Sequence, residues 1–213
     1  MLRRFSILIL LCGLWWIPIS SAADEPPRLL VVGDSLSAAF GIPLEQGWVA
    51  LLAERLQIKN PAYQVINASI SGETTMGGLT RLPALLERHE PEWVIISLGG
   101  NDGLRGIALS EMRGNLQRMI HLSRDGGAQV LLVGIQIPPS LGRQYTQRFY
   151  QIYHELAEEY ALPLVPFLLE DVALVDGMMQ ADGIHPTAAA QPIMLENVWS
   201  VLAKPLLVPA TNP

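Results

Sequence analysis

Three polar motifs directly follow apolar runs in the sequence, and each holds residues that could do chemistry. They read GDS (33–35), SISGETT (69–75) and GGNDG (99–103). If the apolar runs are parallel strands, the motifs lie together at the edge of the sheet where ligands bind. Ser35 ends the first motif, and a tight turn at Gly33 would expose its hydroxyl. The first motif therefore predicts either a nucleophile or a simple helix cap.

A fourth motif, DGIHP, near the end of the chain, supplies the groups that a serine nucleophile needs. Imidazole titrates near neutrality, which lets His185 accept the proton of a hydroxyl. Asp182 can hold the other ring nitrogen and fix its tautomer. The backbone N–H groups of Ser35 and Gly72 and the side-chain amide of Asn101 can bind an oxyanion. The four motifs together predict a hydrolase that forms an acyl-serine.

Other chemistries fit these motifs less well. A metal site formed by Asp34, Asp182 and His185 would need a second histidine at ligand spacing. A phosphate-binding loop would need Lys-Ser or Lys-Thr after GGNDG. The α/β-hydrolases use a G-x-S-x-G elbow, whereas this chain has Ser37 in the last position. Neither a metal nor a cofactor is expected. The remaining histidines are expected on helix surfaces: His89, His121 and His154.

The four motifs resemble the signature blocks of the SGNH (GDSL) hydrolase family, and Ser35, Gly72, Asn101 and His185 match the four letters of its name. The resemblance is closest to the bacterial periplasmic multifunctional esterases, thioesterases and lysophospholipases. It implies hydrolysis of acyl-CoA, lysophospholipid and aryl esters through an acyl-serine, with Asp182 completing the triad. It also implies a flavodoxin-like three-layer α/β/α sandwich with a five-stranded parallel sheet. A carbohydrate acetylesterase or an acyltransferase of the same fold is the alternative.

Periodicity locates the elements that must position these groups. Mostly continuous apolar runs predict strands buried on both faces, at 28–33, 63–68, 92–99, 129–135 and 162–167. Apolar residues at helical spacing predict helices at 48–56, 78–89, 112–126, 147–161 and roughly 187–203. The alternation of strand and helix predicts a parallel sheet between two helix layers.

Apolar side chains near the motifs could line a groove for an acyl chain. Residues 103–108 contain glycines that would let this stretch move as a flap beside the site. Met178 and Met179 lie near the histidine motif, where they could be adaptable lining or ordinary packing. The alternative for the whole set is ordinary core and loop residues. The residues expected to contact substrate are Met76, Leu79, Arg105, Ile107, Leu109 and Pro138.

The N-terminal segment has the three-part layout of a secretory signal peptide. Two arginines precede an apolar run that is shorter than the roughly 20 residues of a membrane-spanning helix, and small residues follow it. The only cysteine, Cys12, lies in this segment, so the mature chain is expected to have no disulfide and no thiolate ligand. We expect removal of residues 1–22 by cleavage after Ala22 or Ala23. One hydrolase domain, 23–213, would then reach the periplasm.

The charge balance argues against nucleic acid and anionic membrane surfaces as partners. The formal net charge is −6, and the 14 basic residues do not cluster. Phosphate backbones and anionic lipids both attract clustered cations. The expected partner is therefore a small acyl ester or thioester. Nothing in the sequence indicates stable membrane insertion after signal cleavage or an assembly larger than a monomer.

Overall fold

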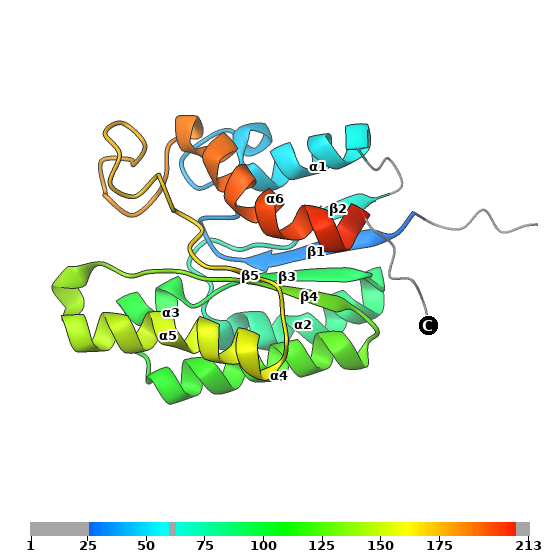
Figure 1. Ribbon diagram of the computed structural model, residues 1–213, viewed down its shortest axis with the longest axis horizontal. Coiled ribbons are helices and arrows are strands. Elements are labelled where there is room, and N and C mark those ends of the chain that lie inside the picture. Colours follow the sequence, from blue (N-terminus) through cyan, green and yellow to red (C-terminus); the bar gives the residue numbers. More distant parts are fainter. Residues whose placement is uncertain (1–25, 60–62, 208–213) are drawn as a thin grey trace, which may run out of the picture.

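The strands of the structure form a single parallel sheet (Figure 1). The computed structural model describes residues 26–59 and 63–207. Its five strands lie in the order β2-β1-β3-β4-β5, and every neighbouring pair is parallel. This is the strand order of flavodoxin-like folds, so the predicted fold class is confirmed. The strands are β1 (Arg28–Gly33), β2 (Gln64–Asn67), β3 (Trp93–Ser97), β4 (Gln129–Val133) and β5 (Leu164–Val165).

Helices cover both faces of the sheet and complete the three layers (Figure 1). One face carries α1 (Trp48–Lys59) and α6 (Gln191–Leu207). The other face carries α2 (Thr75–His89), α3 (Gly100–Leu104), α4 (Leu109–Asp125) and α5 (Arg143–Glu159). Short 3-10 helices are η1 (Leu44–Gln46), η2 (Pro139–Leu141) and η3 (Ala188–Ala190).

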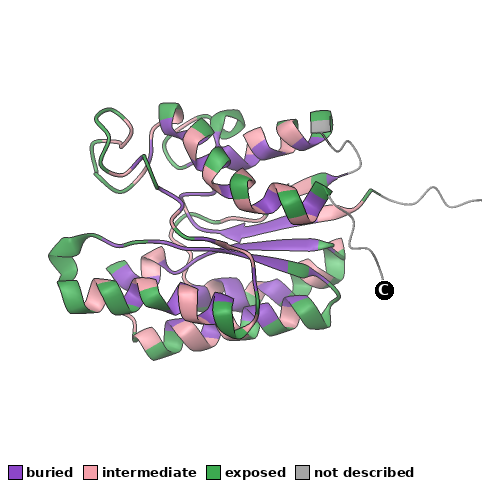
Figure 2. Cartoon of the chain, in the orientation of Figure 1, coloured by how far each residue is buried: buried purple, intermediate pink, exposed green. Residues whose placement is uncertain are grey.

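Each face of the sheet has its own apolar core, because side chains alternate along a strand. Leu29 and Val31 of β1 pack in the core beneath α1 and α6, whereas Leu30 and Val32 pack beneath α2, α4 and α5. Figure 2 shows the buried residues concentrated along the strands and on the helix faces turned toward them. Full burial of one such side chain contributes roughly 1.5–3 kcal/mol. The two cores therefore fix the sheet between its helix layers.

Element boundaries differ from the predicted ones for local reasons. β2 lies at the edge of the sheet, so its residues are half-buried or exposed rather than buried on both faces. α2 begins at Thr75, earlier than predicted, because the Thr74 side chain accepts a hydrogen bond from the Gly77 N–H and caps the helix. β5 has only two residues, since Pro163 and Pro166 flank it and lack the N–H that a ladder needs.

The predicted signal peptide lies outside the described residues. Over residues 26–59 and 63–207, no helix combines the length and the apolar character that crossing a bilayer requires.

Candidate active site

The side chains of Ser35, His185 and Asp182 form one hydrogen-bonded chain at the carboxyl edge of the sheet. His185 Nε2 lies 2.9 Å from Ser35 Oγ, although the two residues are 150 positions apart. His185 Nδ1 lies 2.7 Å from Asp182 Oδ2. Ser35 follows the end of β1, and the other two residues lie in the loop that precedes η3. These are the contacts that a hydroxyl nucleophile makes with a general base and the base with an orienting carboxylate.

The Asp182 carboxylate is held by its own loop. Its Oδ1 accepts the backbone N–H groups of Ile184 and His185 at 2.9 and 3.0 Å. The hydrogen bond with the His185 ring, followed by these backbone donors, holds the pKa of Asp182 well below its usual range. The carboxylate therefore stays ionised at neutral pH and can stabilise an imidazolium beside it.

Asp34 supports the turn that presents Ser35. Its Oδ1 accepts the Leu36 N–H at 3.0 Å, and its backbone carbonyl accepts the Ala38 N–H at 2.9 Å. Only 2% of Asp34 is exposed, and this burial raises its pKa to about 6. The Asp34 Oδ2 atom accepts a long hydrogen bond from Asn101 Nδ2, at 3.4 Å. The acid of the GDS motif thus serves the turn and reaches the neighbouring motif.

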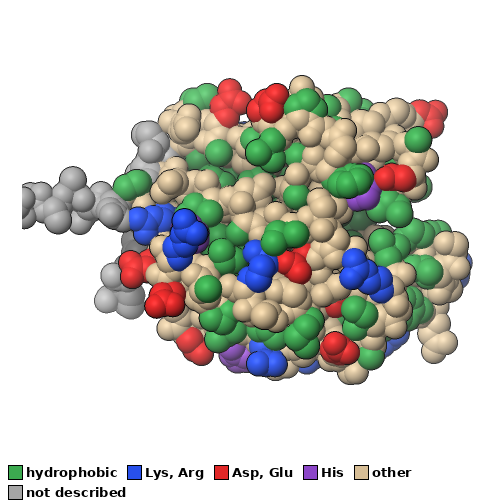
Figure 3. Space-filling model, turned by 180° about the vertical axis from the view of Figure 1, so that it is seen from behind, with side chains coloured by type: hydrophobic (Ala, Val, Ile, Leu, Met, Phe, Trp, Pro, Cys, Tyr) green, Lys and Arg blue, Asp and Glu red, His purple; other side chains and the backbone are tan. Residues whose placement is uncertain are grey.

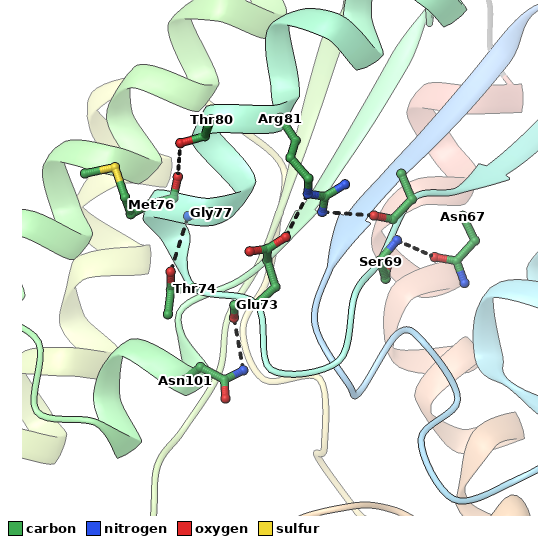
Figure 4. Close-up of polar contacts among 10 residues, drawn as sticks. Asn67, Ser69, Glu73, Thr74, Met76, Gly77, Thr80, Arg81 and Asn101 are labelled. Atoms are coloured by element: carbon green, nitrogen blue, oxygen red, sulfur yellow. Dashed lines mark hydrogen bonds and ion pairs between the residues drawn. The ribbon is translucent and has the colours of Figure 1, made fainter.

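Gly72 and Asn101, the predicted oxyanion donors, lie in touching segments. Asn101 is in the first turn of α3, and its Nδ2 donates to the Glu73 carbonyl at 3.0 Å (Figure 4). Gly72 directly precedes Glu73 and has φ +81°, a left-handed conformation that favours glycine. Arg105 donates to the Gly72 carbonyl at 2.8 Å. Asn101 lines the same cleft as Ser35, whereas Gly72 is not among the lining residues.

A cleft of about 710 Å³ opens at Ser35. Figure 3 shows a notch between the two helix layers with hydrophobic side chains on both of its sides. Among the described residues that line the cleft there is neither lysine nor arginine. Such a cleft suits an apolar group of small-molecule size. Part of its wall follows β4 or comes from α5, with Ile135, Ile137 and Tyr150; the facing wall follows β5, with Phe167, Leu169 and Ile184.

The residues expected to contact substrate do not form one surface. Pro138 lines the cleft. The prediction that Leu79 contacts substrate is wrong. This residue of α2 packs in the core, and only 5% of it is exposed. Leu109 packs partly buried against the same core. Met178 and Met179 both pack against the α1–α6 core, and Met179 also lines the cleft. The remaining three lie outside the lining: Met76, Arg105 and Ile107.

Several residues beside the histidine were not singled out from the sequence. The Phe40 ring lies 4.3 Å from the His185 ring, centroid to centroid, although Phe40 belongs to the loop after β1. Tyr150 and Phe167 line the cleft far from any motif. For lining residues such as Ile135 and Phe167, the only signal is their place shortly after β4 or β5, whereas Tyr150 on α5 has none. Among the other histidines His121 is exposed, as expected, whereas two are half-buried: His89 and His154.

The Gln180 side chain joins the histidine loop to the serine turn. Its Nε2 donates to the Phe40 carbonyl at 2.8 Å and to the Pro186 carbonyl at 2.9 Å. Its backbone N–H donates to the His185 carbonyl at 2.7 Å. Because Phe40 lies shortly after Ser35 and Pro186 directly follows His185, these bonds hold the two loops in register.

The family to which the chain belongs follows from its match to a family model. The model of the GDSL-like Lipase/Acylhydrolase family matches residues 31–192, from β1 into the start of α6. This range contains Ser35, Asn101, Asp182 and His185. The chain belongs to this family and is an acyl hydrolase.

Relatives with names and solved structures agree with this assignment. Esterase TesA of Pseudomonas aeruginosa is 53% identical over 199 residues, which are 93% of this chain and 98% of that protein. Thioesterase 1/protease 1/lysophospholipase L1 of Escherichia coli is 44% identical over 177 residues, or 83% and 82% of the two chains. The crystal structure of TesA has a TM-score of 0.81 at 55% identity and covers 83% of this chain and 98% of that chain.

Gln180→Glu should lower activity by uncoupling the two loops. A carboxylate of the same shape cannot donate, so the Phe40 and Pro186 carbonyls would both lose their donor. We expect kcat/KM for an ester to fall about tenfold, because small displacements of reacting groups are costly. Steady-state kinetics would compare it with Gln57→Glu, at an exposed position of α1. Equal kcat/KM for the two variants would contradict the coupling.

Asp34→Asn should change stability in a pH-dependent way. Because the folded-state pKa of Asp34 is about 6 against 3.8 ordinarily, the wild type loses stability as pH rises through this window. The variant has no carboxyl there and does not lose this stability. The free energy of unfolding of the variant minus that of wild type should therefore rise by at most about 3 kcal/mol from pH 4 to pH 7.

Urea unfolding at several pH values measures this difference. The new amide beside Asn101 can also change stability, but an amide does not titrate, so that contribution is the same at every pH. Asp125→Asn, at the exposed end of α4, is the control. A difference between Asp34→Asn and wild type that is the same at pH 4 and pH 7 would show that burial does not raise this pKa.

Proposed function

We propose that the chain hydrolyses carboxylic esters and thioesters through an acyl-serine intermediate on Ser35. The observation that carries this proposal is the hydrogen-bonded chain from Ser35 Oγ through His185 to Asp182. The names of the relatives, an esterase and a thioesterase that is also a lysophospholipase, support both kinds of acyl bond. The substrate class is therefore small acyl esters and thioesters, including acyl-CoA, lysophospholipid and aryl esters.

In the acylation step, the neutral His185 imidazole takes the Ser35 proton on Nε2 as Oγ attacks the carbonyl carbon. The carbonyl π pair moves onto oxygen, and Asp182 stabilises the imidazolium. When the tetrahedral intermediate collapses, the bond from the carbonyl carbon to the leaving group breaks. This bond is C–O in an ester and C–S in a thioester. The imidazolium gives its proton to that leaving group, and the acyl group remains on Ser35.

In the deacylation step, water takes the place of the alcohol or thiol. His185 accepts a proton from water as the water oxygen attacks the acyl-serine carbonyl. Collapse of the second tetrahedral intermediate breaks the bond to Ser35 Oγ, which receives the proton back. The products are a carboxylic acid and the free enzyme, so no external reductant, oxidant or cofactor enters the cycle.

The oxyanion of both intermediates would be bound by the backbone N–H groups of Ser35 and Gly72 and the Asn101 amide. In the structure the Asn101 amide donates to the Glu73 carbonyl and to the Asp34 carboxylate. The longer bond, 3.4 Å to Asp34, is the one that an oxyanion would replace most readily. Loss of one such donor typically lowers kcat by about 10²–10³-fold.

The acyl chain would lie in the cleft beside Ser35. Its lining is mostly apolar, with Ile135 and Ile137 from one layer and Phe167 and Leu169 from the other. An apolar chain gains roughly 0.8 kcal/mol for each buried CH₂ group. A medium-to-long acyl group should therefore be favoured over a short one.

Ser35→Ala tests the mechanism. We expect it to lose at least about 10³-fold in kcat against a short and a long p-nitrophenyl ester and an acyl-CoA, because the nucleophile is gone. A fluorophosphonate should label wild type on Ser35, located by mass spectrometry, and should not label the variant. Ser200→Ala, an exposed serine on α6, is the matched control. Wild-type rates in folded Ser35→Ala, or label on another residue, would refute the assignment.

Export through the N-terminal segment forms part of the proposal. The sequence pattern of residues 1–23 supports it. When the full chain is expressed in a Gram-negative host, the periplasmic fraction should contain a protein that lacks 22 or 23 N-terminal residues, as measured by intact mass. Full-length mass in the cytoplasmic or membrane fraction would argue against cleavage.

A further inference from the structure

Asp102 is a buried carboxylate that the proposed chemistry does not use. It directly follows Asn101 in α3, and only 1% of it is exposed. Both of its oxygens accept hydrogen bonds from the same residue. Oδ2 accepts the Thr75 N–H at 2.8 Å, and Oδ1 accepts the Thr75 hydroxyl at 2.5 Å. Burial of a carboxylate is costly unless it accepts hydrogen bonds, so loss of either bond from Thr75 would be unfavourable. The two bonds therefore hold Asp102 and Thr75 in one relative position.

Thr75 is itself fully buried and connects a third helix. It is the first residue of α2, and its Oγ1 accepts the Asn115 amide of α4 at 3.1 Å. Asn115 is also buried, with 4% exposed. The three side chains therefore tie α3, α2 and α4 together at one point, and a buried polar group with its partners satisfied favours a single geometry.

Capping of α2 does not account for this arrangement. The cap of that helix is Thr74, whose side chain accepts the Gly77 N–H at 3.2 Å (Figure 4). Asp102 adds a second acceptor for the next residue, and it does so from the helix that carries Asn101. The bond thus links α3 to α2, in addition to satisfying a backbone N–H in the first turn of α2.

The link lies between the two segments that hold the oxyanion donors. Gly72 precedes Thr75 by three residues, and Asn101 precedes Asp102 by one. At the other side of the loop, Arg81 donates to the Ala68 carbonyl at 3.1 Å and pairs with Glu73 at 2.7 Å (Figure 4). The loop before α2 is thus held to that helix by Arg81, whereas Asp102 holds Thr75, the first residue of α2, to α3.

We propose that Asp102 and Thr75 are positioning residues, whose paired hydrogen bonds set the separation between the Gly72 N–H and the Asn101 amide. This inference rests on the proposed function, in which both groups bind the oxyanion. Preorganised donors stabilise the transition state only when they meet the developing charge at hydrogen-bond distance. A looser link should therefore lower kcat while leaving the binding of the acyl chain in the cleft unchanged.

A pair of variants at Thr75 tests the inference. Thr75→Val keeps the shape but removes the hydroxyl, so Asp102 loses one donor and Asn115 loses its acceptor. Thr75→Ser keeps the hydroxyl. We expect kcat per fluorophosphonate-titrated site to fall about tenfold in Thr75→Val with KM within about twofold of wild type, and Thr75→Ser to restore kcat.

Ser123→Ala provides the matched control. It also removes a fully buried hydroxyl, bonded to the Met119 carbonyl at 2.8 Å, but it lies in the last turns of α4, away from the oxyanion segments. It should lower Tm without changing kcat per titrated site. A similar loss of kcat in Ser123→Ala and Thr75→Val would reduce the effect to general destabilisation and overturn the inference.

Two further results would also overturn it: equal kcat for Thr75→Val and Thr75→Ser, or a change confined to KM. If Thr75→Val does not fold, Asp102→Asn replaces it, since it leaves the Thr75 hydroxyl without a carboxylate acceptor and should lower kcat at least about threefold. Unchanged kcat in that variant would overturn the inference. Wild-type activity in Ser35→Ala would instead refute the proposed function, which separates the two failures.

Discussion

The 2.9 Å contact between His185 Nε2 and Ser35 Oγ constrains the rest of the structure. β1 lies next to the edge strand β2, and β5 forms the opposite edge, so the segment after β5 must cross the carboxyl edge of the sheet to reach Ser35. After this crossing segment, α6 packs against α1, and the Gln191 side chain at the start of α6 accepts the Trp48 N–H at 2.9 Å. The Gln180 bonds then hold the crossing segment against the serine turn. The fold thus makes a local contact from distant parts of the chain.

The pKa values of two carboxyl groups near this contact are shifted in opposite directions, because their surroundings differ. Asp182 lies in an exposed loop, and hydrogen bonds to its charged form lower its pKa. Asp34 is buried, and desolvation raises its pKa to about 6. In the proposed mechanism His185 becomes positive, and the charged form of Asp182 suits that side of the site. Beside Asn101, where the proposed oxyanion forms, burial disfavours the charged form of Asp34, although a pKa of about 6 leaves it mostly ionised at pH 7.

The sequence predicted the polar site better than the apolar one, for physical reasons. Nucleophile and amide come from short motifs at strand ends, and the parallel sheet brings strand ends together, so Ser35 and Asn101 could be predicted to lie close without coordinates. His185 lies far along the chain from any strand end, and its role was predicted from the DGIHP motif. Cleft residues have no such pattern, since one wall follows β4 or comes from α5 and the other follows β5. Leu79 shows the limit: its proximity to a motif in sequence suggested the groove, but helix rotation turns it into the core. The short β5 likewise depends on Pro163 and Pro166, which lie inside the apolar run that predicted a longer strand.

The separation between these two parts bears on how one family can act on different acyl compounds. The polar groups come from the ends of β1 to β3 and from the DGIHP loop, and Ser35, Asn101 and His185 each have a hydrogen-bond partner from another segment. The cleft walls come largely from the segments after β4 and β5, where Leu174 is fully exposed and Tyr150 half-buried. A substitution in those walls changes the shape offered to the acyl chain without removing a hydrogen bond of the polar site. In the proposed function, chain-length preference can therefore change while the chemistry at Ser35 stays the same, because the two depend on different residues.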